Sequence, residues 1–446
     1  MNYVPHTKED RSEMLSAIDV SSVDQLFADV PLEIKLDRDL NLPAAMSELE
    51  LMNYMSELAG KNISTDQVVS FLGAGVYDHY VPSAVKHIIS RSEFYTSYTP
   101  YQAEVSQGML QAIFEYQTLM CELTGMDISN ASLYDGATGV AEAAMMSSRI
   151  TRKQRIIISQ TVHPDYRTTL KTYAHNLDFD VEEIPFKDGI TDFEALKELI
   201  SNETACVIVQ NPNFFGYIEN MEIASEIAHK EKALFVACVD PISLGILASP
   251  GEYGADIAIG EGQALGIPMG FGGPHLGFIT CQKKHMRQMP GRIAGETSDN
   301  KGRRGYLLTL QAREQHIRRE RATSNICSNQ ALCALAATVY LSWLGKQGIK
   351  ELAEMCLQKA HYACEKLSLV PGLKRKHSAP FFKEFVMKMP LDPEKISSDL
   401  ISANILGGLP LKRFYPALSD SMLIAVTEKR TKEEIDMLCR ALEGLV

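Results

Sequence analysis

From about residue 130 onward, the sequence alternates short apolar runs with longer segments of helical pattern, and this alternation limits the possible folds more than any other feature. The runs are short and rich in β-branched residues, which favours strands over buried helices. Strands that alternate with helices build a mostly parallel sheet covered on both faces, with its ligand site at the carboxyl ends of the strands. The predicted strands are 156–158, 206–209, 234–236, 257–259 and 278–279, and the clearest helices between them are 192–200 and 219–229.

The segments on either side of this α/β region have different patterns. Residues 1–60 are helical in pattern, rich in acidic and apolar residues, and interrupted by the Leu-Asn-Leu-Pro run at 40–43. They indicate an N-terminal arm that packs on a neighbouring chain. We therefore expect three parts, which are a helical arm over 1–75, a large α/β domain over 76–325 and a smaller C-terminal α+β domain over 326–446.

The C-terminal domain is expected to follow a long helix over 328–367. Two apolar runs, 381–389 and 422–426, predict strands there. Thr431 with Glu434 three residues later forms the pattern of a capping box, so a helix is expected over 431–442.

Charge and composition exclude several classes of function. The chain has 56 acidic and 44 basic residues and a formal net charge of −12, which argues against non-specific nucleic-acid binding. The longest apolar stretch, 331–345, is shorter than the roughly 20 residues that span a bilayer, and the first ten residues are too polar for a secretory signal. The nine cysteines have neither a CxxC pair nor a Cys/His ligand spacing, so we expect no disulfides and no metal site. We expect a cytoplasmic protein without a membrane segment.

Three loops that follow predicted strands or open helices carry residues that suit a bound cofactor. Asp240 follows a buried strand, where its carboxylate can hold a protonated ring nitrogen or can cap the next segment. Gly136, Thr138 and Gly139 lie in a turn that opens an alanine-rich helix, whose first amides can cradle an anion or reflect ordinary capping. His163 comes just after another strand, where an imidazole can stack on a cofactor ring or be structural.

The segment GEGQALGIPMGFGGPH, residues 260–275, makes the comparison with known proteins specific. It resembles the P-protein of the glycine cleavage system, a pyridoxal phosphate (PLP)-dependent glycine decarboxylase. In that family a lysine lies four residues before an Ile-Pro that leads into a run of glycines. Counting back from Ile267-Pro268 places Gln263 at the lysine position. Other segments resemble the same family in the same order: MNYVPHT at the start, SEFYTSYTPYQAEVSQG (92–108), YDGATGVAEAAMM (134–146) and RERATSNIC (319–327).

Gln263 changes the chemistry that the resemblance implies. A lysine amine adds to the PLP aldehyde, whereas the amide nitrogen of glutamine is delocalised into its carbonyl and cannot form a Schiff base. No lysine lies between Lys232 and Lys283, so a small misalignment cannot restore one. The chain therefore resembles subunit 1 of the split form of the family, with a PLP-dependent aminotransferase-like fold (fold type I). Its expected vestigial PLP pocket comprises Gly136, Thr138, Gly139, His163, Asp240 and Gln263.

A tyrosine-rich loop is the first candidate for contact with another chain. It contains Tyr95, Tyr98, Tyr101 and Glu104. Phenol groups can hydrogen-bond a phosphate or carboxylate, so the loop can contribute to a partner's active site. Tyrosine is also enriched in ordinary interfaces, so interface packing stays an equal alternative.

An arginine cluster between 303 and 321 is the second candidate. Its mixture with Glu314 and Glu320 is typical of a solvated face with local ion pairs, and it also suits docking of an acidic partner. The candidate docking patch is Arg313, Arg318, Arg319 and Arg321, and the other two arginines of the cluster are Arg303 and Arg304.

The resemblance also implies an activity that needs other proteins. A lysine-bearing subunit 2 would hold PLP, and the complex, with two of each subunit, would decarboxylate glycine. Carbon dioxide would leave, and the aminomethyl group would pass to lipoylated H-protein. This chain would bind no PLP covalently and would be inactive alone. Two other hypotheses stay open: a non-catalytic scaffold or regulatory protein with an empty PLP-like pocket, and a self-sufficient PLP enzyme that uses an unconventional residue.

Overall fold

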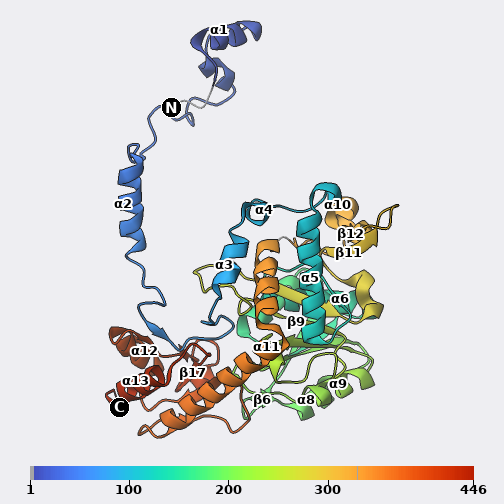
Figure 1. The fold of residues 1–446 in the computed structure, drawn as a ribbon, viewed down its shortest axis with the longest axis vertical. Coiled ribbons are helices and arrows are strands. Elements are labelled where there is room, and N and C mark those ends of the chain that lie inside the picture. Colours follow the sequence, from blue (N-terminus) through green and yellow to red (C-terminus); the bar gives the residue numbers. More distant parts are fainter. Residues whose placement is uncertain (1–4, 329, 446) are drawn as a thin grey trace. The chain divides into compact units, whose positions relative to one another are not determined.

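The computed structural model describes residues 5–328 and 330–445. Residues 1–4 of the family-like MNYVPHT opening and Asn329 of the predicted 328–367 helix lie outside the described residues. The chain forms two compact units, Met1–Ile63 and Ser64–Val446, both drawn in Figure 1. Among the described helices, none is long and apolar enough to cross a membrane.

The described part of the first unit, residues 5–63, is built around two helices that bury no residue. They are α1 (Lys8–Ala17) and α2 (Glu48–Ala59), and both begin with a capping box. Neither helix contains a buried residue. The helical pattern over 1–60 is thus confirmed at its two ends, while the middle contains only a short 3-10 turn, Val23–Phe27. That this arm packs on a neighbouring chain stays a prediction.

A seven-stranded sheet dominates the second unit. The five strands predicted from the apolar runs all lie in it, and the mostly parallel sheet is confirmed: β9, β8, β7, β3 and β4 pair in parallel, and β10 and β2 pair antiparallel at one edge. In spatial order the strands are β2 (Ile128–Ser129), β10 (Gly277–Cys281), β9 (Ile257–Glu261), β8 (Leu234–Val239), β7 (Thr204–Asn211), β3 (Arg155–Ser159) and β4 (Asp180–Ile184).

Helices cover both faces of this sheet, as the unbroken apolar strands require. Alternate residues point to opposite faces, so Val207 and Phe235 join a core with α5, α9 and α11, while Ile208 and Val236 join a core with α6 and α7. The helices of the unit are α3 (Ser83–Ile89), α4 (Ser92–Tyr95), α5 (Gln107–Thr124), α6 (Gly136–Thr151), α7 (Pro164–Ala174), α8 (Phe193–Leu199), α9 (Met221–Lys230), α10 (Gln315–Arg318), α11 (Ala331–Ser368), α12 (Pro393–Ser402) and α13 (Lys432–Glu443).

The C-terminal part has its own antiparallel sheet and its own apolar core. The predicted strands appear as β14 and β17, and the predicted capping box of Thr431 and Glu434 opens α13. The long helix α11 is interrupted at Gly345, whose φ of 62° is left-handed. The remaining strands and their partners are β13 (Lys374–Arg375), β14 (Glu384–Lys388), β17 (Ser421–Ala425) and β16 (Leu409–Pro410) in this sheet, and the pairs β1 (Val69–Ser70) with β15 (Ile405–Leu406), β5 (Phe186–Lys187) with β6 (Ile190–Thr191), and β11 (Ile293–Ser298) with β12 (Arg304–Thr309). The domain boundaries expected at 75 and 325 stay a prediction.

Candidate functional site: a PLP-like pocket filled by its own side chains

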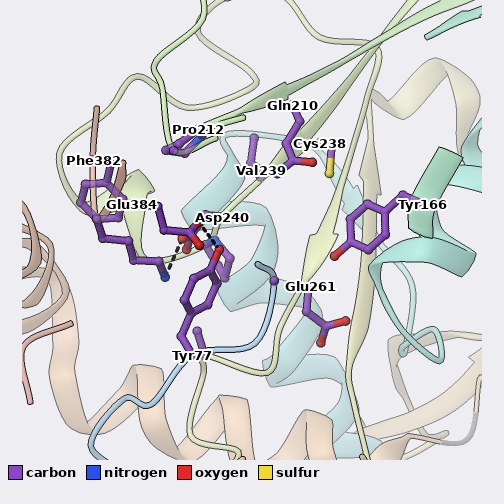
Figure 2. A pocket seen from close by; sticks show the side chains of 15 residues that line it. Tyr77, Tyr166, Gln210, Pro212, Cys238, Val239, Asp240, Glu261, Phe382 and Glu384 are labelled. Atoms are coloured by element: carbon purple, nitrogen blue, oxygen red, sulfur yellow. Dashed lines mark hydrogen bonds and ion pairs between the residues drawn. The ribbon is translucent and has the colours of Figure 1, made fainter. Parts of the chain in front are cut away.

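A small cavity lies where parallel strands end, as the fold class predicts. Three neighbouring strands bring a polar residue to its lining, Gln210 from β7 (Thr204–Asn211), Asp240 just after β8 (Leu234–Val239) and Glu261 at the end of β9 (Ile257–Glu261) (Figure 2). Tyr77 and Lys383 line the cavity from segments far away in the sequence. The cavity measures only about 30 Å³, which is room for roughly one or two water molecules.

Asp240 already has a cationic partner in this pocket. The ammonium of Lys383 lies 2.6 Å from one Asp240 carboxylate oxygen, and Lys383 is only 2% exposed. The other carboxylate oxygen accepts a hydrogen bond from the amide of Ile242 at 2.9 Å. Asp240 therefore caps the following turn, which is one of the two functions that the sequence left open. Its cationic partner is the protein's own Lys383, and that Asp240 holds a ring nitrogen stays a prediction.

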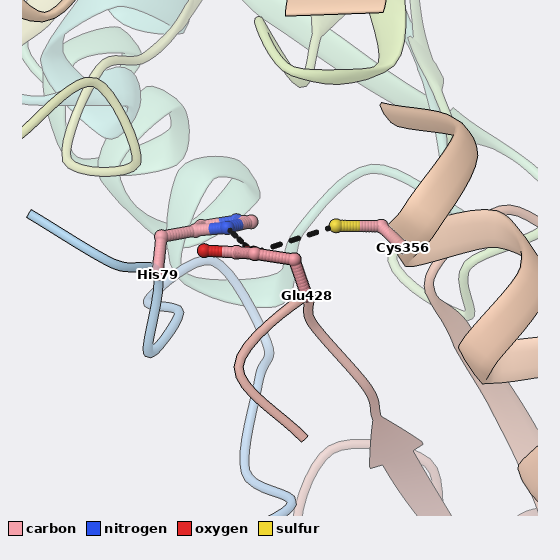
Figure 3. A group of neighbouring side chains, drawn as sticks. All are labelled: His79, Cys356 and Glu428. Atoms are coloured by element: carbon pink, nitrogen blue, oxygen red, sulfur yellow. Dashed lines mark hydrogen bonds and ion pairs between the residues drawn. The ribbon is translucent and has the colours of Figure 1, made fainter. Parts of the chain in front are cut away.

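Lys383 begins a chain of polar contacts that ends at Glu428. Its ammonium lies 3.1 Å from Nε2 of His79. Because lysine only donates, this nitrogen accepts, and the other ring nitrogen, Nδ1, donates to Glu428 at 2.6 Å. The Cys356 thiol also points to Glu428, at 3.6 Å (Figure 3). The sequence predicted no metal site, and the fold brings these His, Cys and Glu side chains together. The two ring nitrogens of His79 are already engaged, one by the hydrogen bond to Glu428 and the other by the ammonium of Lys383.

Tyr77 and Glu384 close another side of the cavity. The phenol of Tyr77 donates to the Glu384 carboxylate at 2.7 Å, and the amide of Ala74 donates to it at the same distance. The ammonium of Lys383 lies 3.5 Å from the centre of the Tyr77 ring, a short cation–π contact. Burial raises the pKa of Glu384 to about 7. The carboxyl group is thus poised to change its protonation state near neutral pH.

Glu261 occupies the helix start that could have held an anion. One of its oxygens accepts from the amide of Gly136, the first residue of α6, at 3.0 Å. The other accepts from the amide of Gln263 at 3.0 Å. Asp135 caps the same helix through the amide of Thr138 at 2.7 Å. Gly136, Thr138 and Gly139 lie inside the first turn of the helix, which therefore begins one turn earlier than the sequence indicated. The amides of Gly136 and Thr138 bind carboxylates of the chain itself.

Gln263 lies buried beside this pocket and fastens one wall of it. Its side-chain oxygen accepts from the amide of Tyr77 at 2.9 Å. Its side-chain nitrogen donates to the carbonyl of Tyr77 at 3.1 Å and to that of Ile267 at 2.8 Å. Both the oxygen and the nitrogen of the Gln263 side chain are therefore hydrogen-bonded within the protein, as a buried amide requires.

His163 is likewise held by the protein. Its Nδ1 accepts from the amide of Asp165 and caps α7, and its Nε2 is 2.8 Å from the carbonyl oxygen of Ala74. The ring stacks on Tyr166 at 4.7 Å between centroids. Burial lowers the pKa of His163, so the imidazole is neutral at physiological pH, and both ring nitrogens are engaged.

The comparisons with known proteins show the family of this chain. Residues 1–442 match the family described as glycine cleavage system P-protein. The chain belongs to the P-protein family of the glycine cleavage system. It is 58% identical over 444 residues to the probable glycine dehydrogenase (decarboxylating) subunit 1 of Carboxydothermus hydrogenoformans, and 56% identical over 445 residues to that of Desulforamulus reducens. Each alignment covers 100% of both chains.

Solved structures confirm the predicted fold class. The chain is similar to a crystal structure of glycine decarboxylase (P-protein) of the glycine cleavage system in inhibitor-bound form, with a TM-score of 0.91, 43% identity and full coverage of both chains. A NifS-like protein matches with a TM-score of 0.65 at 14% identity, covering 85% of this chain and 99% of its own. This second likeness shows the fold alone. The large unit thus has the PLP-dependent fold type I.

The pocket of this P-protein family member does not fit PLP. The carboxylate that suits a ring nitrogen, Asp240, is paired with Lys383. An amide that suits the phosphate, that of Gly136, is bound by Glu261. Residue 263 cannot form a Schiff base. A cavity of about 30 Å³ has no room for the pyridine ring. The groups that would bind the ring nitrogen and the phosphate are thus already bound by side chains of the protein itself.

The predicted contact residues lie outside this pocket. Tyr95, Tyr98, Tyr101 and Glu104 are all exposed. Tyr101 is held in place by Arg292, which donates to its hydroxyl at 2.9 Å and lies 5.2 Å from its ring centre. The loop therefore presents tyrosines to the outside, and one of them is fixed against an arginine that the sequence did not single out.

The arginine cluster separates into three groups. Arg303 and Arg304 face Asp299 and Glu296, at 2.7 and 4.0 Å, so they form the local ion pairs that such a pattern favours. Arg313 is partly buried and donates to the carbonyl oxygens of Met289 and Gly291. The exposed members of the predicted docking patch are Arg318, Arg319 and Arg321.

The most informative pocket residues were missed by sequence reasoning. Lys383 and Glu384 are adjacent charges inside the apolar run 381–389, and a charged pair in a predicted strand is a signal for internal pairing. Glu261 follows the predicted strand 257–259 with only Gly260 between them, and so lies at the end of the sheet where ligands bind. Tyr77 has no such signal, because only the fold brings its segment to the strand ends.

Proposed function

We propose that this chain is the subunit of a two-subunit glycine decarboxylase that does not hold PLP. A lysine-bearing subunit 2 holds the cofactor, and the complex, with two copies of each subunit, decarboxylates glycine. Carbon dioxide is released and the aminomethyl group passes to lipoylated H-protein. The observation that carries the proposal is the filled pocket, in which Lys383 and Glu261 take the places of a ring nitrogen and a phosphate. The names of the similar proteins, glycine dehydrogenase (decarboxylating) subunit 1, support a second subunit.

Within this proposal the chain contributes surfaces to its partner. In this proposal the tyrosine-rich loop with Tyr95, Tyr98, Tyr101 and Glu104 completes the partner's active site, and the exposure of these residues supports such a contact. In this proposal Arg318, Arg319 and Arg321 attract an acidic H-protein, chiefly by raising the association rate, and their exposure supports this role. The apolar N-terminal arm supplies further interface.

The filled pocket also bears on the two alternative hypotheses. A scaffold protein with an empty PLP-like pocket is disfavoured, because the pocket is occupied by the chain's own groups. A self-sufficient enzyme would need a reactive lysine, and Lys383 lines the pocket. However, its ammonium lies at Asp240, the carboxylate suited to the ring nitrogen, rather than where an aldehyde would lie.

Co-purification with the lysine-bearing homologue tests the proposal. The two chains together should form a stable complex that exchanges the glycine carboxyl group with bicarbonate when H-protein is present, and either chain alone should be inactive. Borohydride treatment with PLP should label the partner and leave this chain unlabelled. Failure of the two chains to associate, or a specific PLP label on this chain, would contradict the proposal.

A further inference from the structure

A cavity of about 380 Å³ lies along the bend of α11 and shares no lining residue with the filled pocket. The helix leaves regular geometry at Gly345, and residues from both sides of this bend line the cavity together with residues from two distant segments. The aromatic, sulfur-containing and acidic residues of the lining are Tyr80, Tyr340, Trp343, Met355, Glu351 and Glu428. The proposed function gives this cavity no ligand.

Aromatic side chains form an open wall of the cavity. Trp343 is the only tryptophan of the chain and is 57% exposed, and Tyr80 is 58% exposed. Met355, also in the lining, is exposed as well. The face of an aromatic ring attracts a cation, and that of tryptophan attracts it most strongly. The wall thus suits a cation that carries an apolar part.

The charged groups of the lining are acidic. Among the described residues that line the cavity, Glu351 and Glu428 are charged and none is basic. Glu351 is exposed, and Gln347 donates to its Oε1 at 2.8 Å, which leaves Oε2 for a ligand. Glu428 is fixed, because the Tyr80 amide donates to its Oε1 at 2.6 Å and His79 donates to its Oε2 (Figure 3). Burial alone would raise the pKa of Glu428, but these hydrogen bonds outweigh it and hold the pKa at about 2.

Two lysines lie near Glu428 but do not line this cavity. The ammonium of Lys383 lies on the far nitrogen of the His79 ring, and that of Lys359 contacts the backbone carbonyl oxygen of Glu428. Among the described residues, no ammonium therefore binds the Glu428 carboxylate itself. The lining keeps its negative charge.

Tyr340 adds an uncharged acceptor. It is 2% exposed, yet among the described residues its hydroxyl makes no hydrogen bond, and unlike the hydroxyls of Tyr116 and Tyr253 it is not sealed from solvent. A buried phenol usually has a polar partner. Burial and then the charge of Glu428 raise the pKa of Tyr340, so the phenol stays neutral and can accept from an N–H group.

We propose that this cavity binds a guanidinium group, which stacks on Trp343 and donates to Glu351 and to the Tyr340 hydroxyl. A guanidinium is favoured over an ammonium because it is planar, weakly hydrated and carries several donors in one plane. The cavity exceeds the group itself, so an alkyl stem can lie against the exposed Met355. The inference does not rest on the proposed function.

The fluorescence of the isolated full-length chain tests the assignment directly, because Trp343 is its only tryptophan. Butylguanidinium should change the emission saturably. Butylurea has nearly the same shape without the charge and should bind about tenfold more weakly or worse. Butylammonium, which has the charge without the plane, should also bind more weakly than butylguanidinium. Absence of a saturable change, or equal binding of butylurea, would overturn the inference.

Substitutions in α11 locate the site. Glu351→Gln, followed by fluorescence, and Trp343→Leu, followed by calorimetry, should each weaken butylguanidinium binding by about tenfold. Glu354→Gln is the matched control, because Glu354 faces Lys350 at 3.8 Å and does not line the cavity, and it should leave binding unchanged. Binding that neither of the first two variants weakens would contradict the assignment.

A peptide distinguishes the two sources of a guanidinium group. Acetyl-Gly-Arg-Gly-amide should bind at least as tightly as butylguanidinium if the cavity takes an arginine side chain of another protein. Binding of butylguanidinium without binding of the peptide would assign the cavity to a free guanidinium compound. Failure of both would refute the site, and none of these outcomes bears on whether the two-subunit complex decarboxylates glycine.

Discussion

Gln263 and Tyr77 exchange two hydrogen bonds, one in each direction. The backbone amide of Tyr77 donates to the glutamine oxygen at 2.9 Å, and the glutamine nitrogen donates back to the carbonyl of Tyr77 at 3.1 Å. An amide side chain can do both, whereas a lysine ammonium only donates. The residue at the lysine position therefore has a structural function here. It fixes the segment that carries Tyr77 into the pocket.

Gln263→Lys is expected to destabilise the chain without creating a PLP enzyme. The Tyr77 amide would lose its acceptor in a buried place, which should lower the free energy of unfolding by about 1–3 kcal/mol. PLP and borohydride should still leave no specific label, because Lys383 and Glu261 fill the pocket. Urea unfolding and mass spectrometry measure the two effects.

Gln347→Lys is the matched control for this change. Gln347 is exposed on α11, so its replacement should alter neither stability nor labelling. A stoichiometric PLP label in the Gln263→Lys variant that the control lacks would show that the pocket can open.

Lys383→Met should be among the most damaging substitutions in the pocket. It leaves the largely buried Asp240 carboxylate without its cation, and breaking a buried pair in this way costs about 3–5 kcal/mol. Adding Asp240→Asn should recover most of the loss, since no unpaired charge then remains. A double-mutant cycle of unfolding free energies measures the coupling, and additive effects of the two changes would refute the pairing.

The strand–helix order was predictable because burial on both faces leaves an unbroken apolar signature in each strand, as in 156–158 and 206–209. The missing lysine was predictable from one fixed distance to Ile267-Pro268. The side chains that fill the pocket were not predictable, because Lys383 and Tyr77 lie about 300 residues apart in the sequence. Local pattern cannot show which distant side chains a fold will bring to one strand end. The same holds for Arg292, which only the fold places on Tyr101.

Glu384 is expected to make stability depend on pH near neutrality. Burial raises its pKa from an ordinary 4.5 to about 7, so between these values the folded chain retains a proton that the unfolded chain has released. Its contribution to stability is fully present below about pH 4.5 and is lost as the pH rises to about 7, by up to about 3 kcal/mol.

Glu384→Gln isolates this contribution, because the amide stays neutral at every pH. The unfolding free energy of the wild-type chain, relative to that of the variant, should fall between pH 5 and pH 7 and stay constant above pH 7. Urea titrations at several pH values measure it. A difference that does not vary with pH would mean that the carboxyl group titrates normally.

The N-terminal arm is expected to govern association rather than folding of the chain. In α2, Leu51, Met52, Met55 and Leu58 follow the spacing of an apolar helix stripe, yet all are exposed. Leu51→Asp with Met55→Asp should therefore leave the unfolding free energy within about 0.5 kcal/mol of wild type and weaken binding to the lysine-bearing partner. Buried apolar area drives such contacts, so two charges in the stripe should remove the complex in analytical ultracentrifugation. Asn53→Asp adds a charge to the same helix outside the stripe and should preserve the complex. A complex that survives the two changes in the stripe would assign the arm no part in the interface.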